Sequence, residues 1–418
     1  MLRVISRALV SAGAVLTLLL GAACTPLVPR VAPEVFITQA VKPPSAVLFS
    51  TEELILSPAV LAAALESAYL KKITDGFIDL CQGKAVGCAI SAVGPNGMSV
   101  DRAAGDARRA PDDAPRKLTA TDKITMASVS KTFTGTALQK LLYDKGICLD
   151  TAIGPYLPNH WKRSAAMDAV TFRQLLTHTS GLTCQGISYD QLKTCVSTAS
   201  PCPSPQHYRN ENFALMRILI PQIDGMVKLK ALIDADLAGN SGPLATAYAN
   251  YYIESVNETV FAPAGLPQMF CKPTDASPAL SYKSATVDKW DFTQVGPGDP
   301  WGDMSNWCGS QGWFLSAHQM AQAMRAIMTP DKVLTKDSLD EMKLGNLAVY
   351  FADFGDGLQA WNHGGYHPAE MNMGEINTLI IHFNNGVSVG VVINSPYGAN
   401  GQGGDFYGDL IAAVKAAG

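Results

Sequence analysis

Residues 126–146, MASVSKTFTGTALQKLLYDKG, carry the strongest local signal in this chain. Apolar side chains recur in them at helical spacing, and a glycine closes the run, which predicts an amphipathic helix that stops near Gly146. Ser128 stands at the start of this helix, where backbone N–H groups and the helix dipole favour a developing negative charge. Lys131 follows one turn later on the same face.

This spacing suggests a nucleophile and its base. A neutral or partly desolvated amine at Lys131 could take the proton of the Ser128 hydroxyl. The alternative is an ordinary capping serine beside a solvated lysine, since an S-x-x-K match arises about once by chance in a chain of this length. These residues alone leave both interpretations open.

Outward from the helix, β structure is predicted on both sides. Residues 85–107 contain two strands around a Pro95-Asn96-Gly97 turn. Residues 376–383 and 387–393 are apolar, β-branched runs separated by an Asn-Gly turn of the kind that tight hairpins use. The chain therefore places predicted strands before and after a long, helix-rich middle.

Helices are predicted from Ser57 to about Leu80 and from Asp405 to Ala417. Together these elements predict an α+β fold, in which an antiparallel sheet is flanked by the N- and C-terminal helices and a helical domain is inserted. We assign residues 57–118 and 331–418 to the sheet domain and residues 119–330 to the helical domain.

The N-terminus has the pattern of a bacterial secretion signal over residues 1–24: two arginines, an apolar stretch too short to span a membrane comfortably, and small residues. The small residues before Cys24 resemble a lipoprotein cleavage site, although the usual leucine stands one place too far away, at Leu20. Ordinary signal-peptidase cleavage is the alternative. The proline-rich residues 25–56 are expected to be a tether. We expect an exported protein, periplasmic or anchored to a membrane by a lipid on Cys24.

The cysteines agree with export. Apart from Cys24 they form an even set, which favours disulfides, although some could be buried thiols. Their pairing does not follow from the sequence. Three of them crowd the segment 183–207, which we expect to be a stapled loop at the mouth of the active site. The eight are Cys81, Cys88, Cys148, Cys184, Cys195, Cys202, Cys271 and Cys308.

Composition narrows the function. Hydrophobic residues make up 47% and charged residues 16%, so the chain can bury a sizeable core. With 32 Lys+Arg against 36 Asp+Glu, it has no basic field for nucleic acid, and no such partner is expected. No P-loop, dinucleotide fingerprint or clustered metal ligands occur, so neither a cofactor nor a metal is expected. A G-x-S-x-G nucleophile elbow is also missing.

Together with segments further along the chain, the serine motif resembles that of a known protein family. Residues 126–133 resemble the nucleophile motif of penicillin-recognising serine hydrolases, in the branch of class C β-lactamases, D-Ala-D-Ala carboxypeptidases and esterases. Residues 175–182, LLTHTSGL, are similar to a linking segment of that branch. The resemblance runs from about residue 80 to 395. It implies the β-lactamase/transpeptidase-like fold, with Ser128 as nucleophile and Lys131 beside it.

The branch's second motif, Y-x-N, is matched by Tyr208 and Asn210. A rival match begins at Tyr248, but Tyr208 is preferred because it follows the H-T-S-G-L segment by one loop and precedes a long apolar stretch. The resemblance gives Tyr208 a share in acid and base catalysis and lets Asn210 hold the lysine and the substrate amide. A phenol beside an ammonium is expected to have a lowered pKa.

The third motif, H-x-G, is matched by His363, Gly364 and Gly365. Glycines on a strand let a substrate backbone approach closely. By analogy, the N–H groups of Tyr366 and Ser128 would form the oxyanion hole. The neighbouring His367 is expected to lie on the surface.

The resemblance implies a serine hydrolase that acts through an acyl-enzyme on an ester or amide, either a small molecule or a peptidoglycan-derived substrate. His363 stands where β-lactamases carry a lysine, which weakens an antibiotic-resistance interpretation. The alternatives are a D,D-carboxypeptidase, a β-lactamase, or a sensor that binds penicillin or peptidoglycan without turnover.

Overall fold

The computed structural model describes residues 57–418 except 226–228, 285–289, 292–293, 370–372 and 399–403. The signal peptide, the tether and the lipidation site at Cys24, all predicted within residues 1–56, lie outside the described residues. In the part that is described, no helix is both long and apolar enough to cross a membrane.

The described residues form a seven-stranded antiparallel sheet in the order β3-β2-β1-β9-β8-β7-β6. Its centre joins the two ends of the chain, because β1 pairs with β9 in a register that sets Cys88 opposite Ile393. The strands are β1 (Gly87–Val93), β2 (Ser99–Arg108), β3 (Arg116–Lys117), β6 (Tyr350–Asp353), β7 (Gln359–His367), β8 (Ile376–Phe383) and β9 (Ser388–Ile393). A separate pair joins β4 (Ile124–Thr125) to β5 (Phe314–Leu315).

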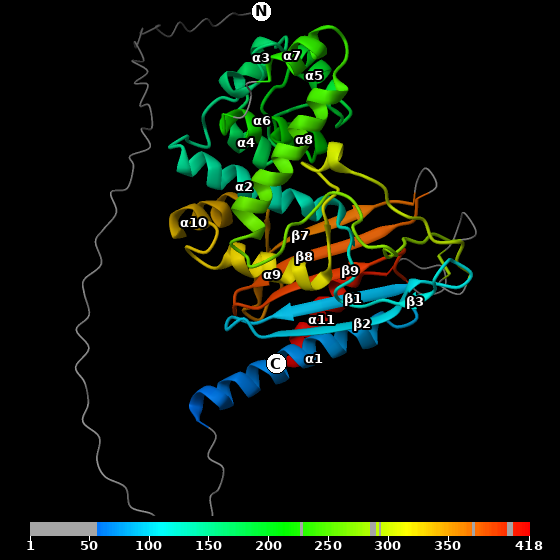
Figure 1. Cartoon of the computed structure of the whole chain (residues 1–418). Helices are drawn as coiled ribbons and strands as arrows, with labels where there is room; N and C mark the ends of the chain where they lie inside the picture. The colour runs from blue at the N-terminus through cyan, green and yellow to red at the C-terminus, as the bar shows by residue number, and fades with distance from the viewer. Residues whose placement is uncertain (1–56, 226–228, 285–289, 292–293, 370–372, 399–403) are drawn as a thin grey trace, which may run out of the picture. The chain divides into compact units, whose positions relative to one another are not determined.

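Helices cover both faces of this sheet. The terminal helices α1 (Pro58–Cys81) and α11 (Phe406–Ala417) pack on one face, and α9 (Ala317–Met328) packs on the other (Figure 1). Ser57 caps α1 and Asp405 caps α11 through their side chains, as expected for residues that satisfy free N–H groups. The predicted α+β fold, with its sheet built from both ends of the chain, is confirmed.

The remaining helices lie on the α9 side of the sheet (Figure 1). The central one, α2 (Ser130–Asp144), buries the apolar residues that predicted it and ends before Gly146, whose φ of 65° suits glycine. The domain boundaries assigned from the sequence stay a prediction. The other helices are α3 (Ala165–Asp168), α4 (Phe172–Leu176), α5 (Tyr189–Thr198), α6 (Asn210–Ile223), α7 (Lys230–Leu237), α8 (Gly242–Val256) and α10 (Lys336–Gly345), with short turns η1 (Ala127–Val129), η2 (Gly154–Tyr156), η3 (Asn257–Phe261) and η4 (Ser305–Trp307).

Three disulfides form within the described residues. Cys81–Cys88 joins the end of α1 to the start of β1, Cys184–Cys195 fastens a loop to α5, and Cys271–Cys308 closes the longest loop of the three. Cys202, the third cysteine of the segment 183–207, is instead an exposed free thiol. Six of the eight cysteines thus pair with one another, as the even number suggested, whereas Cys202 does not.

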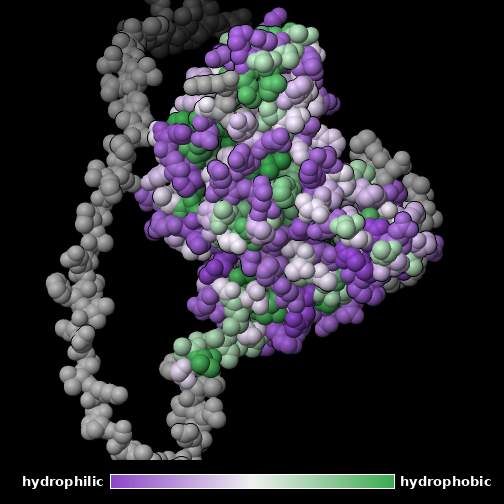
Figure 2. Space-filling view, in the orientation of Figure 1, coloured by the Kyte–Doolittle hydropathy of each residue, from purple (hydrophilic) through white to green (hydrophobic). Residues whose placement is uncertain are grey.

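The face of the molecule shown in Figure 2 is mostly polar. The first turns of α1 are an exception, since they expose several apolar side chains and stand out as a pale green extension at the foot of the view.

Candidate active site

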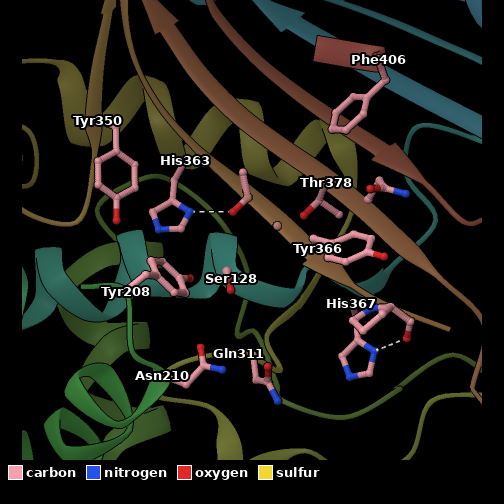
Figure 3. Close-up of a pocket in the computed structure, with 14 residues that line it drawn as sticks. Ser128, Tyr208, Asn210, Gln311, Tyr350, His363, Tyr366, His367, Thr378 and Phe406 are labelled. Atoms are coloured by element: carbon pink, nitrogen blue, oxygen red, sulfur yellow. Dashed lines mark hydrogen bonds between the residues drawn. The ribbon is translucent and has the colours of Figure 1, made fainter. Parts of the chain in front are cut away.

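Ser128 lies in the tight turn η1, between β4 and α2. The preceding residue, Ala127, has a φ of 46°, which is a strained conformation for a residue with a Cβ. The N–H of Met126 donates to the carbonyl of Trp313 at 3.0 Å, and this bond fixes the entry to the turn. Backbone strain of this kind is typical of functional positions, and here it points the Ser128 hydroxyl into a cavity (Figure 3).

Lys131 is fully buried one turn beyond the serine. Its Nζ lies 3.0 Å from Ser128 Oγ, 2.8 Å from Asn210 Oδ1 and 2.8 Å from the carbonyl oxygen of Ser310. Burial holds the pKa of Lys131 well below its ordinary value, and the nearby Glu211 carboxylate offsets only part of this effect. The amine is therefore disposed to be neutral beside the serine.

Tyr208 and Asn210 arrive from the start of α6. The Tyr208 hydroxyl hydrogen-bonds with Ser128, and its ring centroid lies 4.9 Å from Lys131 Nζ. Although 43% of Tyr208 is exposed, burial around the hydroxyl raises its pKa, against the lowering effect of the bond to Ser128. The lowered phenol pKa predicted from the sequence is therefore wrong, because burial of the hydroxyl outweighs the hydrogen bond that favours its charged form.

His178, from the H-T-S-G-L segment, packs against the ring of Tyr208. The two rings lie 4.4 Å apart, and His178 Nδ1 accepts a hydrogen bond from the N–H of Arg209 at 3.1 Å. The rival Tyr248 lies elsewhere, buried on α8 and hydrogen-bonded to Gln222. Of the two Y-x-N matches, the structure brings only the one at Tyr208 to Ser128.

The H-x-G motif lies on β7, opposite the serine turn. His363 is buried, and its Nδ1 lies 2.7 Å from the carbonyl oxygen of Gly364. Since a carbonyl only accepts, Nδ1 carries the proton and Nε2 presents a lone pair, which has no partner in the structure. Burial, as the largest cause, lowers the pKa of His363 to about 3, so its ring is neutral at physiological pH.

Gly365 explains how close the strand comes to the serine. A Cβ at this position would lie 2.1 Å from Thr378 Oγ1 and 2.3 Å from the carbonyl oxygen of Met126, so no larger residue fits without a shift. Strand β6 pairs with β7 only as far as Asn362. Residues 363–367 thus face the cavity from an edge that β6 does not cover.

A cavity of about 670 Å³ brings these groups together (Figure 3). The sequence did not predict six of its lining residues, namely Gln311, Tyr350, Pro368, Asn377, Thr378 and Phe406. Tyr350 packs 5.2 Å from the His363 ring and hydrogen-bonds with Gln206. The lining residues are Ser128, Tyr208, Asn210, Gln311, Tyr350, His363, Gly364, Gly365, Tyr366, His367, Pro368, Asn377, Thr378 and Phe406.

Two expectations need correction here. His367 lines the cavity and packs edge-on against Trp301 at 4.5 Å, so it is not a simple surface residue. The stapled segment 183–207 contributes no residue to the described lining. It contacts the site through Gln206, which hydrogen-bonds with Tyr350, and through the N–H of His207, which donates to the carbonyl of His178. Its disulfide fastens the loop to α5 instead.

A model of the Beta-lactamase family matches residues 62–413. The chain belongs to this family. No curated protein matches it. Among solved structures, it is similar to a D-amino acid amidase from Ochrobactrum anthropi SV3, at 19% identity over 85% of this chain and 98% of that one, with a TM-score of 0.57.

Two further solved structures are similar to this chain in fold. A D-stereospecific amidohydrolase from Streptomyces sp. is 18% identical over 83% of this chain and 98% of that one, with a TM-score of 0.56. A penicillin-binding protein homologue from Pyrococcus abyssi is 17% identical over 85% and 77%, with a TM-score of 0.57. At these identities the likeness establishes the fold. Family membership and fold together support a hydrolase of the penicillin-recognising superfamily.

Proposed function

We propose that the protein is a serine hydrolase that acts through an acyl-enzyme on Ser128. It cleaves an ester or amide bond in an uncharged part of its substrate. The observation that carries this proposal is the environment of Lys131. A neutral amine has two N–H groups and one lone pair. Asn210 Oδ1 and the Ser310 carbonyl accept the two N–H groups, which leaves the lone pair for the Ser128 hydroxyl at 3.0 Å.

In this mechanism Lys131 takes the serine proton as Ser128 attacks the carbonyl. Tyr208, whose raised pKa keeps its hydroxyl protonated, passes its proton to the leaving group. The proton that Lys131 took from the serine then moves to Tyr208, which restores both the hydroxyl and the neutral amine. The lone pair of His363 Nε2 accepts a hydrogen bond from the tyrosine or from the substrate. Water then releases the acyl group, with the amine again acting as base.

We assign the oxyanion hole to the backbone N–H groups of Ser128 and Tyr366. The close approach of Gly365 to the serine turn supports this assignment, because it sets the next residue of β7 beside that turn. The glycines Gly364 and Gly365 also leave room for a substrate to lie along the strand edge that β6 leaves open.

The cavity favours a substrate without a carboxylate near the bond that breaks. The described lining contains no Lys, Arg, Asp or Glu, and His363 is neutral. A carboxylate placed here would lose its hydration without gaining a cation, which costs several kcal/mol. Small amides, the substrates named for the similar D-amino acid amidase, fit this lining better than penicillins or peptides with a free carboxyl end.

The test is intact mass over time for the full chain and its Ser128→Ala variant, each mixed with D- and L-amino acid amides, nitrophenyl esters and a penicillin. We expect Ser128-dependent hydrolysis of amides or esters and a transient acyl adduct that maps to Ser128. Unchanged hydrolysis in the variant would exclude the proposed nucleophile. An adduct with penicillin that persists would instead favour a penicillin-binding sensor or peptidase.

We also propose that the protein is exported and held to a membrane by a lipid on Cys24. The three disulfides support an oxidising compartment. Thiol titration of the denatured protein without reductant checks this, since full reactivity of the six paired cysteines would contradict it.

A further inference from the structure

Three consecutive backbone carbonyls, those of residues 308–310, accept hydrogen bonds from side chains around α2. Tyr252 donates its hydroxyl to the first carbonyl at 3.3 Å, Thr134 donates to the second at 2.7 Å, and Lys131 Nζ lies 2.8 Å from the third. The position of the Lys131 amine is thus tied to the position of a loop that lies 179 residues away in the sequence.

The loop fits against α6 in one position. A Cβ on Gly309 would lie 2.6 Å from the carbonyl oxygen of Phe213 and 3.1 Å from the Cβ of Arg217, so the backbone lies directly on the helix. The fully buried Arg217 also reaches Asn306 Oδ1 at 3.3 Å. A displacement of the loop would therefore move the Ser310 carbonyl away from the lysine.

The Cys271–Cys308 disulfide fastens this loop at its first carbonyl residue. Both cysteines are fully buried, and the N–H of Met304 donates to the carbonyl of Cys271 at 2.8 Å. The Cys271 side is held in turn by Asn257 of η3, whose side-chain amide donates to the carbonyl of Met269 at 2.9 Å and accepts from its N–H at 2.7 Å. The disulfide therefore joins the loop to a segment that is itself fixed.

We infer that the Cys271–Cys308 disulfide is a positioning element of catalysis, which holds the Ser310 carbonyl where it orients the Lys131 amine toward Ser128. This inference rests on the proposed role of Lys131 as base. Without the disulfide, the carbonyl can withdraw, and the amine can then rotate its lone pair away from the serine. Water can also reach the amine, which weakens the burial that keeps it neutral.

The experiment compares Cys271→Ala/Cys308→Ala with the matched variant Cys81→Ala/Cys88→Ala, whose cysteines are equally buried but lie under α1 on the opposite face of the sheet. Acylation by an activated ester is followed in single-turnover mode from pH 5 to 10. We expect the acylation rate constant of the first variant to fall about 10-fold, while the half-saturating ester concentration changes less than about 2-fold. We also expect the acidic limb of its pH profile to move to higher pH.

The control should keep the wild-type profile. Thr134→Val removes the bond to the Gly309 carbonyl, together with the contacts of the same hydroxyl with the Ser130 carbonyl and the Tyr252 hydroxyl. It should shift the profile in the same direction but less, and it serves if the double variant fails to fold. An unchanged acidic limb in every variant of the loop overturns the inference while leaving the proposed function intact. If wild-type acylation equals that of Ser128→Ala in the same assay, the proposed function itself fails, and the inference fails with it.

Discussion

The cavity has a helical wall around Lys131 and a strand wall at His363, and these two side chains differ in how completely their polar atoms are hydrogen-bonded. On the helical wall, the Lys131 amine is buried with three oxygen neighbours, so its hydrogen bonds are complete before any substrate binds. On the strand wall, His363 Nε2 is buried without a partner, and Tyr366 is 57% exposed on an edge that β6 does not cover.

This difference separates two tasks. A buried polar atom without a partner costs free energy, and it is tolerated where a ligand will supply the missing bond. In the proposed mechanism, the helical wall is thus preorganised for proton transfer. The strand wall keeps a hydrogen-bonding atom available for the substrate. Changes to the first wall should act on the rate of the chemical step, whereas changes to the second should act on binding.

The largest effect should come from the helical wall. Lys131→Met keeps the length of the side chain but removes the base, and we expect kcat/KM to fall about 10³-fold or more. In the wild type, activity should be lost as the pH falls through the lowered pKa of Lys131, because protonation fills the lone pair. Steady-state kinetics from pH 5 to 10 measures both. Retention of more than a tenth of the activity in the variant would assign the base elsewhere.

The same substitution changes how stability depends on pH. Burial lowers the pKa of Lys131 in the folded protein, whereas the unfolded chain keeps this lysine protonated up to about its ordinary pKa, so folding releases a proton between the two pKa values. The wild type should therefore gain stability relative to Lys131→Met by about 1.4 kcal/mol per pH unit, from the lowered pKa up to about pH 10.5. Urea unfolding at several pH values measures this slope, and a constant difference would mean that the folded protein keeps the lysine charged.

An intermediate effect is expected from Tyr208→Phe. Loss of the hydroxyl that bonds to Ser128 should lower kcat about 10²-fold with little change in KM. Tyr248→Phe is the matched control, since it removes a buried hydroxyl from the rival motif on α8 and should leave kcat within about 2-fold. Equal losses in the two variants would contradict the assignment of Tyr208 to the site.

The smallest of these effects should come from Gly365→Ala on the strand wall. The added Cβ meets the Thr378 hydroxyl and the carbonyl of Met126, so the strand must move away from the serine turn. We expect a loss of about 1–3 kcal/mol in stability. KM should rise more than kcat falls. Gly364→Ala is the control, because a Cβ there would meet only the Thr378 carbonyl at 4.0 Å.

The sequence predicted the parts of the molecule that depend on local pattern. The two hairpins, the terminal helices and the turn after α2 follow from spacing and from glycine or asparagine at set positions. The motifs at Ser128, Tyr208 and His363 could be found because each has a recognisable neighbourhood along the chain. In the structure they lie together around one cavity.

What the sequence did not predict depends on contacts between distant segments. Tyr350 comes from a short edge strand, and the Ser310 carbonyl from a loop without a side-chain signature. The phenol pKa was predicted in the wrong direction, because burial of the Tyr208 hydroxyl outweighs the lowering effect of its bond to Ser128. His367 was misplaced because the packing of Trp301 against it is not visible along the chain.

The pairing of β1 with β9 determines when the sheet can form during synthesis of the chain. Strand β1 is synthesised early, but its partner is completed only at Ile393, so the sheet cannot close on a growing chain. Gly365 likewise meets the serine turn across more than half the length of the sequence. A nascent or truncated chain therefore carries the proposed nucleophile but has no cavity around it, and we expect hydrolytic activity to begin only when the last strands are in place.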